Sequence, residues 1–388
     1  MHLNPVLSEL GHYPLATIRA LAAEREARGL PVIDFSIGDP REPTPQFIID
    51  ALNAGVPAVS QYPTAAGLGE LRAAIADYVE RRFGVSVDPS TQIIPTSGSK
   101  EAIFSTAFAF VDRSSADTVV VPSPGYPVYE RGALFAGATV HRAVLGDDFI
   151  LRAEAIPPSV LERTSLVWTC TPHNPTGAVS TEGDLAELLD ATRSHGALLL
   201  SDECYADVYD PAAFPDGPAS LLEVAGEGSH GALVYLSLSK RSGMTGYRSG
   251  AIVGDAEAIA ALRSLRSTTG TASPEFTQRA AIAAWSDDAH AAERRDIFVE
   301  KRSVLRKAFE ATGHRVVASE AGLYLWVDVG DDEATTHRLL EHGIVVAPGR
   351  NFGPGGEGYI RLALVPGLEE CGAAARALEH ALAEPPGA

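Results

Sequence analysis

A lysine stands at the end of a predicted buried strand in the segment SLSKRSGMTGYRSG (237–250). The strand would deliver Ser237, Ser239 and Lys240 to its carboxyl end, and Arg248 follows after a glycine-containing turn. An amine at the mouth of a hydrophobic core loses its proton more easily than one in water, so Lys240 could attack a carbonyl carbon and form a Schiff base. An ordinary loop lysine beside a solvated arginine explains this segment equally well.

Two further predicted strands also end in polar residues. Asp202 ends ALLLSDE and Tyr205 follows three residues later, while Asn174 lies in TCTPHNPTG (169–177). Ligands of open α/β sheets bind at the carboxyl ends of the strands. A buried carboxylate needs a cationic partner, and a protonated pyridine nitrogen is one candidate. The alternatives are that Asp202 or Glu203 caps the next helix and that Asn-Pro only marks a turn.

A phosphate site is predicted in PTSGSKEAIF (95–104), where a Ser/Gly-rich turn opens a helix. Unpaired backbone N–H groups at such a helix start favour an anion, and Gly98, Ser99 and Lys100 would hold it. An ordinary helix cap is the alternative. Tyr126 follows another strand end and could stack on a flat ring, although core packing is an equally good explanation.

These components together are those that hold pyridoxal 5'-phosphate. The chain also resembles the class I/II aminotransferases of PLP fold type I over essentially its whole length. The resemblance is carried by three motifs in the expected order, which are N-P-T-G, D-x-x-Y and S-x-S-K followed by G-x-R. It implies an α/β protein with a large domain, built on a mostly parallel seven-stranded sheet flanked by helices, and a smaller α+β domain.

The resemblance also implies a role for each matching residue. Lys240 would bind the cofactor covalently, Asp202 would pair with the ring nitrogen, and Asn174 and Tyr205 would hydrogen-bond its phenolic oxygen, so that Lys240, Asp202 and Tyr205 form the catalytic set. Tyr126 would stack on the ring. The groups implied around the phosphate are Gly98, Ser99, Lys100, Ser237, Ser239 and Arg248, with Tyr62 contributed by a neighbouring subunit. A homodimer with shared active sites is therefore expected.

Arg361 in YIRLALV stands where the family binds the substrate α-carboxylate, a task that suits a fork-shaped guanidinium. A surface arginine on a strand is the alternative. Asn174, Gly38 and Tyr13 match family positions that line the substrate pocket. The expected substrates are therefore an amino acid and a 2-oxo acid, with glutamate as one partner.

A finer resemblance, to the N-succinyldiaminopimelate aminotransferases of lysine biosynthesis, lies in FSIGDPREPTPQFIIDAL, SDECYADVY, SLSKRSG, YRSG and AWSDDAHAAERRDIFVEKR. The chain departs from that pattern at SGMTGYR. Aminotransferases for aspartate, aromatic amino acids or LL-diaminopimelate, and a C–S lyase of the same fold, remain alternatives. A PLP-sensing domain of a DNA-binding regulator is disfavoured, because it would require a basic DNA-binding region at the N-terminus and this chain is strongly acidic.

The side chain of an acidic substrate would need cations, and Arg19, Arg41 and Arg241 are candidates only because they neighbour these segments. A solvated surface position is the favoured interpretation of each. The further polar or thiol neighbours of the site are expected to be packing or structural residues, namely His173, Cys170 and Cys204.

The elements that must position these residues can also be predicted from the sequence. Four nearly continuous apolar runs, 118–124, 165–172, 197–203 and 232–239, read as buried strands of a parallel sheet. TEGDLAELLDATRSHG reads as a covering helix with Ser180 or Thr181 as N-cap and Gly196 as C-cap. A long charged helix from about residue 289 would end at Gly313 and bridge two domains. The loop 349–358 is either a ligand loop or a surface connection. We expect an N-terminal segment at 1–35 that joins the small domain, a large domain at 36–285 and a small domain at 286–388.

Composition limits the classes of function. A chain of 388 residues with 45% hydrophobic residues can bury a sizeable core. With 31 basic and 50 acidic residues its net charge is −19, which argues against binding nucleic acid or an anionic membrane. Three cysteines without C-x-x-C spacing argue against disulfides and a zinc site, so we expect a cytoplasmic protein without a metal.

Overall fold

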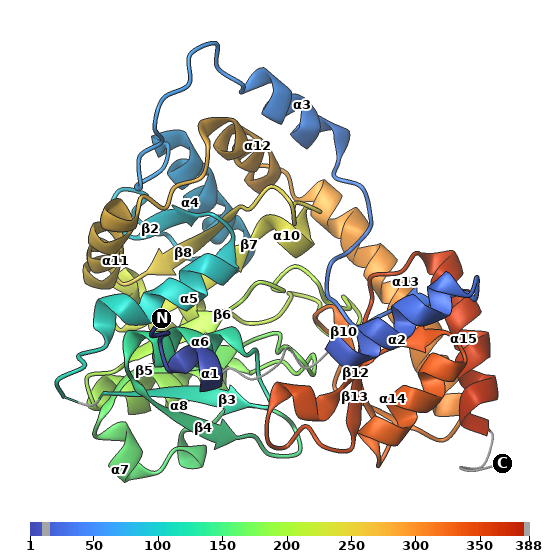
Figure 1. The fold of residues 1–388 in the computed structure, drawn as a ribbon. Coiled ribbons are helices and arrows are strands. Elements are labelled where there is room, and N and C mark those ends of the chain that lie inside the picture. The colour runs from blue at the N-terminus through green and yellow to red at the C-terminus, as the bar shows by residue number, and fades with distance from the viewer. Residues whose placement is uncertain (10–15, 116, 384–388) are drawn as a thin grey trace.

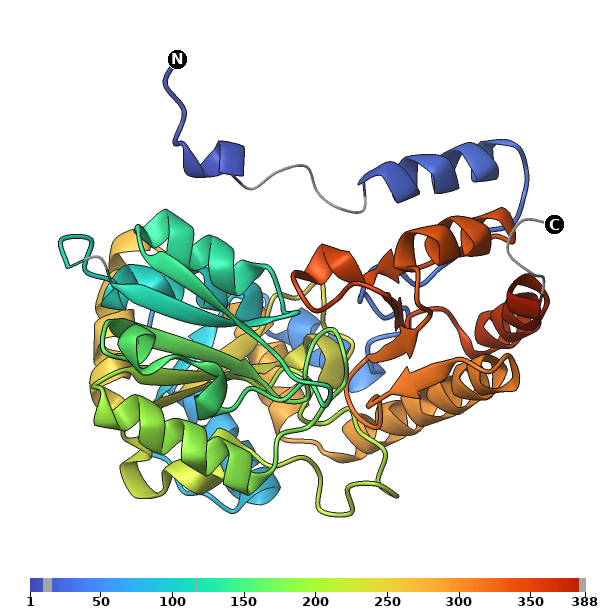
Figure 2. The same cartoon turned by 90° about the horizontal axis from the view of Figure 1, so that it is seen from below.

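The computed structural model describes residues 1–9, 16–115 and 117–383 (Figure 1). Within these residues a seven-stranded sheet has the order β2-β8-β7-β6-β5-β3-β4, and a four-stranded antiparallel sheet has the order β12-β13-β10-β9. The two sheets lie side by side in both views of the molecule (Figures 1 and 2). This arrangement confirms the α/β fold expected from the sequence.

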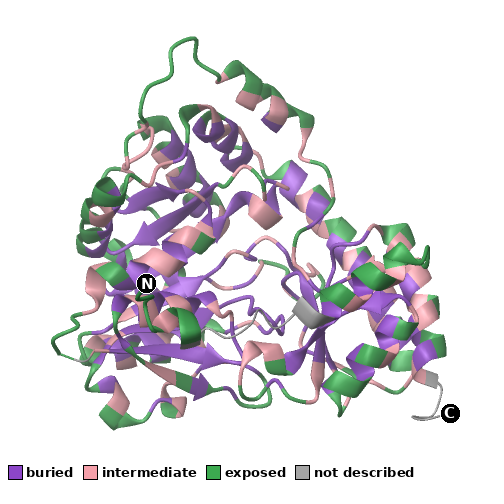
Figure 3. Ribbon diagram, viewed as in Figure 1, coloured by how far each residue is buried: buried purple, intermediate pink, exposed green. Residues whose placement is uncertain are grey.

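The large sheet is mostly parallel. Its strands are β2 (Ile93–Thr96), β8 (Gly250–Gly254), β7 (Ala232–Ser237), β6 (Leu198–Asp202), β5 (Thr164–Cys170), β3 (Thr118–Ser123) and β4 (Thr139–Val144). Strand β8 alone runs antiparallel to its neighbours β2 and β7. The central strands are buried along their whole length (Figure 3), which explains why they read as apolar runs.

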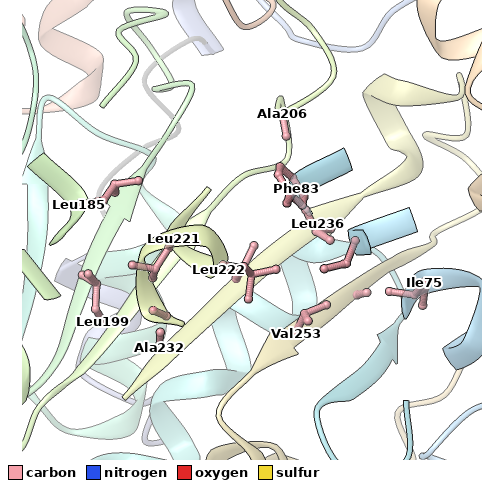
Figure 4. Close-up of a cluster of buried hydrophobic side chains, with 14 of the residues drawn as sticks. Ile75, Phe83, Leu185, Leu199, Ala206, Leu221, Leu222, Ala232, Leu236 and Val253 are labelled. Carbon is pink, nitrogen blue, oxygen red and sulfur yellow. The ribbon is translucent and has the colours of Figure 1, made fainter. Parts of the chain in front are cut away.

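Helices cover both faces of this sheet, because successive side chains of a strand point to opposite sides. On β7, Val234 and Leu236 belong to the cluster formed with α4, α8, α9 and α12 (Figure 4), whereas Leu233 and Tyr235 pack with α5, α6 and α11. The helices of this part are α3 (Gln46–Ala54), α4 (Gly69–Phe83), α5 (Ser99–Phe110), α6 (Val128–Ala136), α7 (Pro158–Leu161), α8 (Glu182–Ser194), α9 (Leu221–Ala225), α10 (Leu238–Arg241), α11 (Ala256–Thr269) and α12 (Glu275–Trp285).

The predicted caps of α8 are largely confirmed. Thr181 is the N-cap and forms a reciprocal capping box with Asp184. At the other end the C-cap is His195, and the predicted Gly196 follows it with φ +71°. A glycine at this position adopts the left-handed conformation that ends many helices, so the prediction was wrong by one residue only.

The smaller sheet packs against a second group of helices and has its own apolar cluster. Its strands are β9 (Arg315–Val317), β10 (Tyr324–Asp328), β12 (Ala347–Pro348) and β13 (Tyr359–Ala363), and its helices are α13 (Ala289–Ala311), α14 (Asp332–Glu341) and α15 (Leu368–Ala383). Helix α13 also contacts α10, which carries Lys240. The long helix therefore touches both parts of the molecule, as the sequence predicted.

The N-terminal segment joins the smaller part through a short parallel pair, β1 (Ile33–Asp34) with β11 (Ile344–Val345). Helix α2 (Ala16–Ala27) contacts β11, while α1 (Val6–Glu9) lies away from the rest of the molecule in Figure 2. The domain limits at residues 35 and 285 stay a prediction. Within the described ranges, no helix is long and apolar enough to cross a membrane.

Candidate active site

One edge of the large sheet gathers the predicted site residues. The parallel strands β5, β6 and β7 end at this edge, and Asn174, Asp202 and Lys240 follow or end them. Strand β8 runs the other way, and its first residue, Gly250, pairs with Ser237 at the end of β7. The antiparallel strand thus brings Arg248, two residues before its start, to the same edge.

A cavity of about 560 Å³ opens at this edge. Twelve of the predicted site residues line it, namely Gly38, Ser99, Lys100, Tyr126, Asn174, Asp202, Tyr205, Ser237, Ser239, Lys240, Arg248 and Arg361. Gly98 lies next to the lining as the N-cap of α5, and Tyr62 lies elsewhere with its side chain fully exposed. Tyr13 is outside the described residues.

Lys240 lies on the short helix α10, which Ser237 caps by accepting a hydrogen bond from the Ser239 backbone N–H at 3.1 Å. Its Nζ donates a hydrogen bond to the Gly38 carbonyl, which comes from the segment between β1 and α3. Burial lowers the pKa of Lys240 to about 8. About a tenth of this amine is therefore neutral and nucleophilic at pH 7, far more than of an ordinary lysine.

Two arginines hold the backbone of α10 in place. Arg294 of α13 donates from Nε to the Lys240 carbonyl at 3.1 Å. Arg241 points away from the cavity, where its buried guanidinium donates to Asp207 Oδ2 at 2.8 Å and to Asp288 Oδ1 at 2.6 Å. These contacts fix the helix on both sides of Lys240.

Asp202 is a buried carboxylate at the floor of the cavity. Its Oδ2 accepts from the Tyr129 hydroxyl at 2.7 Å, and its Oδ1 accepts from the Cys204 backbone N–H at 3.2 Å. Burial raises the pKa of Asp202, and among the described residues no cation lies within ion-pair distance of it. A buried carboxylate without a cationic partner fits a ligand that carries a protonated ring nitrogen.

The opposite end of the cavity suits a phosphate. Helix α5 begins here after Gly98, whose φ of +80° is left-handed, and a β-carbon at Gly98 would collide with the Arg248 guanidinium. Arg248 itself has φ +55°, a costly conformation for a residue other than glycine. The free N–H groups of a twelve-residue helix and this guanidinium together form an anion-binding end. The donor set therefore fits pyridoxal 5'-phosphate, with Lys240 for its aldehyde, Asp202 for its ring and the start of α5 for its phosphate.

The wall contributed by the smaller sheet carries Arg361. Its Nη1 donates to Asn174 Oδ1 at 3.0 Å, its Nη2 donates to the Ser36 carbonyl at 2.7 Å, and its guanidinium lies 4.3 Å from the ring centre of Tyr324. Arg361 is buried, which rules out the alternative of a surface arginine. A buried planar guanidinium suits a substrate carboxylate.

Several residues of the site were missed by the sequence reasoning, among them Tyr324, Phe352 and Tyr129. The Tyr324 hydroxyl lies 2.8 Å from that of Tyr205, and a β-carbon at Gly38 would come within 2.5 Å of the Tyr324 oxygen, which explains the glycine. Phe352 of the loop 349–358 also lines the cavity, so this loop is not only a surface connection. No sequence signal marks Tyr324, but Tyr129 follows Tyr126 at helical spacing and could have been found.

The cations named from sequence neighbourhood do not line the cavity. Arg41 is exposed and pairs with Glu370, and Arg19 is exposed on α2, so the surface interpretation holds for both. It was wrong for Arg241, which is buried in an ion network.

The remaining polar and thiol neighbours also have defined places. His173 is buried, and burial lowers its pKa to about 3, so it is a neutral packing residue, as expected. Cys170 is buried as expected, whereas Cys204 is only partly buried and lines the cavity. In the described part of the chain, no group of histidine, cysteine or acidic residues could hold a metal ion.

Comparisons with known proteins agree with this geometry. Residues 31–378 match the family model for "Aminotransferase class I and II". An LL-diaminopimelate aminotransferase from Desulforudis audaxviator is 37% identical over 369 residues, which cover 92% of each chain. The structure of an aminotransferase from Neisseria meningitidis has a TM-score of 0.90 and 34% identity, covering 97% of this chain and 99% of the other. A probable N-succinyldiaminopimelate aminotransferase from Thermus thermophilus has a TM-score of 0.86 and 28% identity, covering 94% and 99%.

Proposed function

This chain belongs to the class I and II aminotransferases, and from that premise we propose that it transfers an amino group between LL-diaminopimelate and 2-oxoglutarate. Enzymes of this family depend on pyridoxal 5'-phosphate. The observation that carries the proposal is the meeting of Lys240, Asp202 and Arg361 in one cavity. The choice of substrate is supported by relatives named LL-diaminopimelate aminotransferase that match along more than nine-tenths of their length.

The residues of the cavity divide the work. When bound, the cofactor supplies an aldehyde that combines with the substrate amine and a ring that accepts the electron pair left at Cα. Arg361 would bind the α-carboxylate of the substrate. Asn174 accepts a hydrogen bond from Arg361 and would also contact the cofactor, so it would hold substrate and cofactor in a fixed relative position. Lys240 Nζ, with its lowered pKa, is the amine suited to take the proton from the substrate Cα. Asp202 would hold the ring nitrogen in its protonated form.

N-Succinyl-LL-diaminopimelate is the second candidate. It is the substrate first expected from the sequence motifs, and the name of the Thermus thermophilus structure supports it. The larger number of long matches to enzymes named for the free amino acid favours LL-diaminopimelate. Both candidates place the enzyme in diaminopimelate and lysine biosynthesis, and we expect it to work in the cytoplasm.

The test is to load the purified enzyme with pyridoxal 5'-phosphate and measure glutamate formed from 2-oxoglutarate with each amino acid in turn. LL-Diaminopimelate should give the highest kcat/KM among itself, its N-succinyl derivative, aspartate and phenylalanine. A preference for the succinylated compound would establish the second candidate. Pyruvate released from cystathionine without glutamate formation would establish a C–S lyase. Lys240→Ala, checked for folding by circular dichroism, should have no turnover.

We also propose that the enzyme is a homodimer with shared sites. Tyr62 lies in the segment between α3 and α4, which extends from the top of the molecule in Figure 1. Its side chain is exposed and does not line the cavity of its own chain. Val56 and Val59 of the same segment are exposed as well. Light scattering should give twice the chain mass of 40.8 kDa, and Tyr62→Ala should weaken cofactor retention. A monomer with full activity would contradict this proposal.

A further inference from the structure

A dicarboxylic amino acid presents two carboxylates to the cavity, and Arg361 accounts for one of them. Among the described residues the cationic side chains of the lining are Lys100, Arg131, Lys240, Arg248 and Arg361. Lys240 is the reactive amine, while Lys100 and Arg248 lie at the anion-binding end formed by the start of α5. Arg131 is the remaining cation, and neither the sequence nor the family resemblance assigns it a role.

Arg131 lies in the first turns of α6, on the helix that follows Tyr126. It is half-buried, and within the described ranges its guanidinium has no hydrogen bond or ion pair. Its neighbour Glu130 is engaged with Arg142 at the surface and leaves Arg131 without a carboxylate partner. An arginine that lines a cavity with all its donors unpaired is poised to bind an anion from that cavity.

The surroundings of Arg131 favour the far end of a long substrate. Arg131 borders the catalytic cavity and also an adjoining cavity of about 570 Å³, whose lining includes Phe104 and Phe135 together with Lys100 and Arg248. Arg131 and Arg361 line the same cavity as Lys240, so each end of a dicarboxylic substrate that reacts at Lys240 has a cation in that cavity. Apolar walls beside a guanidinium strengthen its attraction to a carboxylate, because less water competes for the charge.

We propose that Arg131 binds the distal carboxylate of the substrate and thereby selects dicarboxylic amino acids. This inference rests on the proposed function and names the residue that reads the end of the substrate remote from the reacting carbon. Arg131 contributes binding energy at that end and takes no part in proton transfer at Cα. It is thus a specificity residue that should act on KM more than on kcat.

The experiment compares LL-diaminopimelate with L-lysine, which is the same molecule without the distal carboxylate. In Arg131→Met, kcat/KM for LL-diaminopimelate should fall about 10- to 100-fold through KM, the loss expected for a charged hydrogen-bonded pair. The value for L-lysine should stay within about twofold, so the preference between the two substrates should collapse. Arg131→Lys should restore part of the preference, since it keeps the charge and loses the planar fork.

Two matched variants separate this role from others. Arg41→Met removes an exposed arginine paired with Glu370, away from Glu130 and Arg131, and it should leave kcat/KM for both substrates unaffected. Lys100→Met should weaken retention of pyridoxal 5'-phosphate, measured by absorbance, and affect both substrates alike. The proposal is overturned if Arg131→Met lowers kcat/KM equally for both substrates or changes it for neither. It is also overturned if Lys100→Met alone abolishes the preference for LL-diaminopimelate over L-lysine. Failure of the wild-type enzyme to use LL-diaminopimelate would instead refute the proposed function.

Discussion

The Tyr129 hydroxyl of helix α6 donates a 2.7 Å hydrogen bond to Oδ2 of Asp202 at the end of strand β6. The ring of Tyr129 is buried and stacks on Trp168, with centroids 4.8 Å apart and planes 14° from parallel. The carboxylate is therefore held by a rigid partner on the side away from the Cys204 backbone. This contact connects the helix that carries Arg131 to the group expected to face the cofactor ring.

Asp202 and Tyr129 should differ in their importance for catalysis. Asp202→Asn removes the negative charge that would keep the ring nitrogen protonated, and we expect kcat to fall at least about 100-fold with little change in KM. Tyr129→Phe keeps the carboxylate and loses one hydrogen bond, so kcat should fall only about 3- to 10-fold. Steady-state kinetics of the two variants check this. An Asp202→Asn enzyme that retains its kcat would contradict the assigned role.

Lys240 should react as an amine with a pKa of about 8. In the enzyme freed of cofactor, acetylation of Lys240 by acetic anhydride should rise about tenfold per pH unit below pH 8 and level off above it. An unperturbed lysine would continue to gain reactivity up to about pH 10.4. Mass spectrometry of peptides labelled between pH 6 and 10 gives the profile, and a half-point above pH 10 would refute the effect of burial.

The same shift predicts a pH dependence of stability. Between pH 8 and about pH 10.4 the unfolded chain keeps a proton on Lys240 that the folded chain has lost. The free energy of unfolding of the cofactor-free enzyme should therefore gain a contribution from this residue as pH rises through that window. Lys240→Met should lack it, and urea unfolding of both proteins at pH 7.5 and 10 measures the difference.

Arg241 should be a major stabilising residue of the large part of the molecule. Arg241→Gln would leave buried acceptors on Asp207 and the Ala284 carbonyl without their cation, and breaking such a buried network costs about 3–5 kcal/mol. Arg81→Gln is the control, because Arg81 also pairs with Asp288 but is much more exposed, and the expected cost is about 1 kcal/mol. Equal shifts of the urea midpoint in the two variants would contradict the importance of burial.

Glu203 should destabilise the protein at neutral and higher pH. Its Oε1 accepts from Ser201 Oγ and from the Leu221 backbone N–H, both at 2.8 Å, while in the described structure its buried Oε2 has no partner. Burial raises the pKa of Glu203 to about 7. The folded state therefore holds a proton between pH 4.5 and 7 that the unfolded state has released, and stability falls as pH rises through this window.

Glu203→Gln removes that penalty and keeps an oxygen to accept both hydrogen bonds. At pH 8 the variant should be more stable by up to about 3 kcal/mol, the free energy that corresponds to the pKa difference. At pH 4.5 the two proteins should unfold at similar urea concentrations. A variant that is equally stable at pH 8 would show that Glu203 is ionised in the fold at no cost.

The sequence by itself determined the strand ends and the chemistry carried on them. Apolar runs that stop at polar residues predicted β3, β5, β6 and β7, because a strand covered on both faces must be apolar along its length. Lys240, Asp202 and Asn174 each follow or end such a run, so their convergence could be inferred from the rule that parallel strands end at one edge. The strand pattern therefore predicted where Lys240 and Asp202 would lie, while their proposed roles came from the family resemblance.

Only the tertiary structure decided what surrounds these groups. Arg361 and Asn174 are 187 residues apart and meet because the smaller sheet packs against the edge of the larger one. Tyr324 lies against Arg361 because their strands, β10 and β13, pair in the smaller sheet, and Arg241, next to Lys240 in sequence, turns away into a buried ion network. The partners, burial and hence the pKa of a side chain depend on every element packed around it, and most of those elements are distant in the chain.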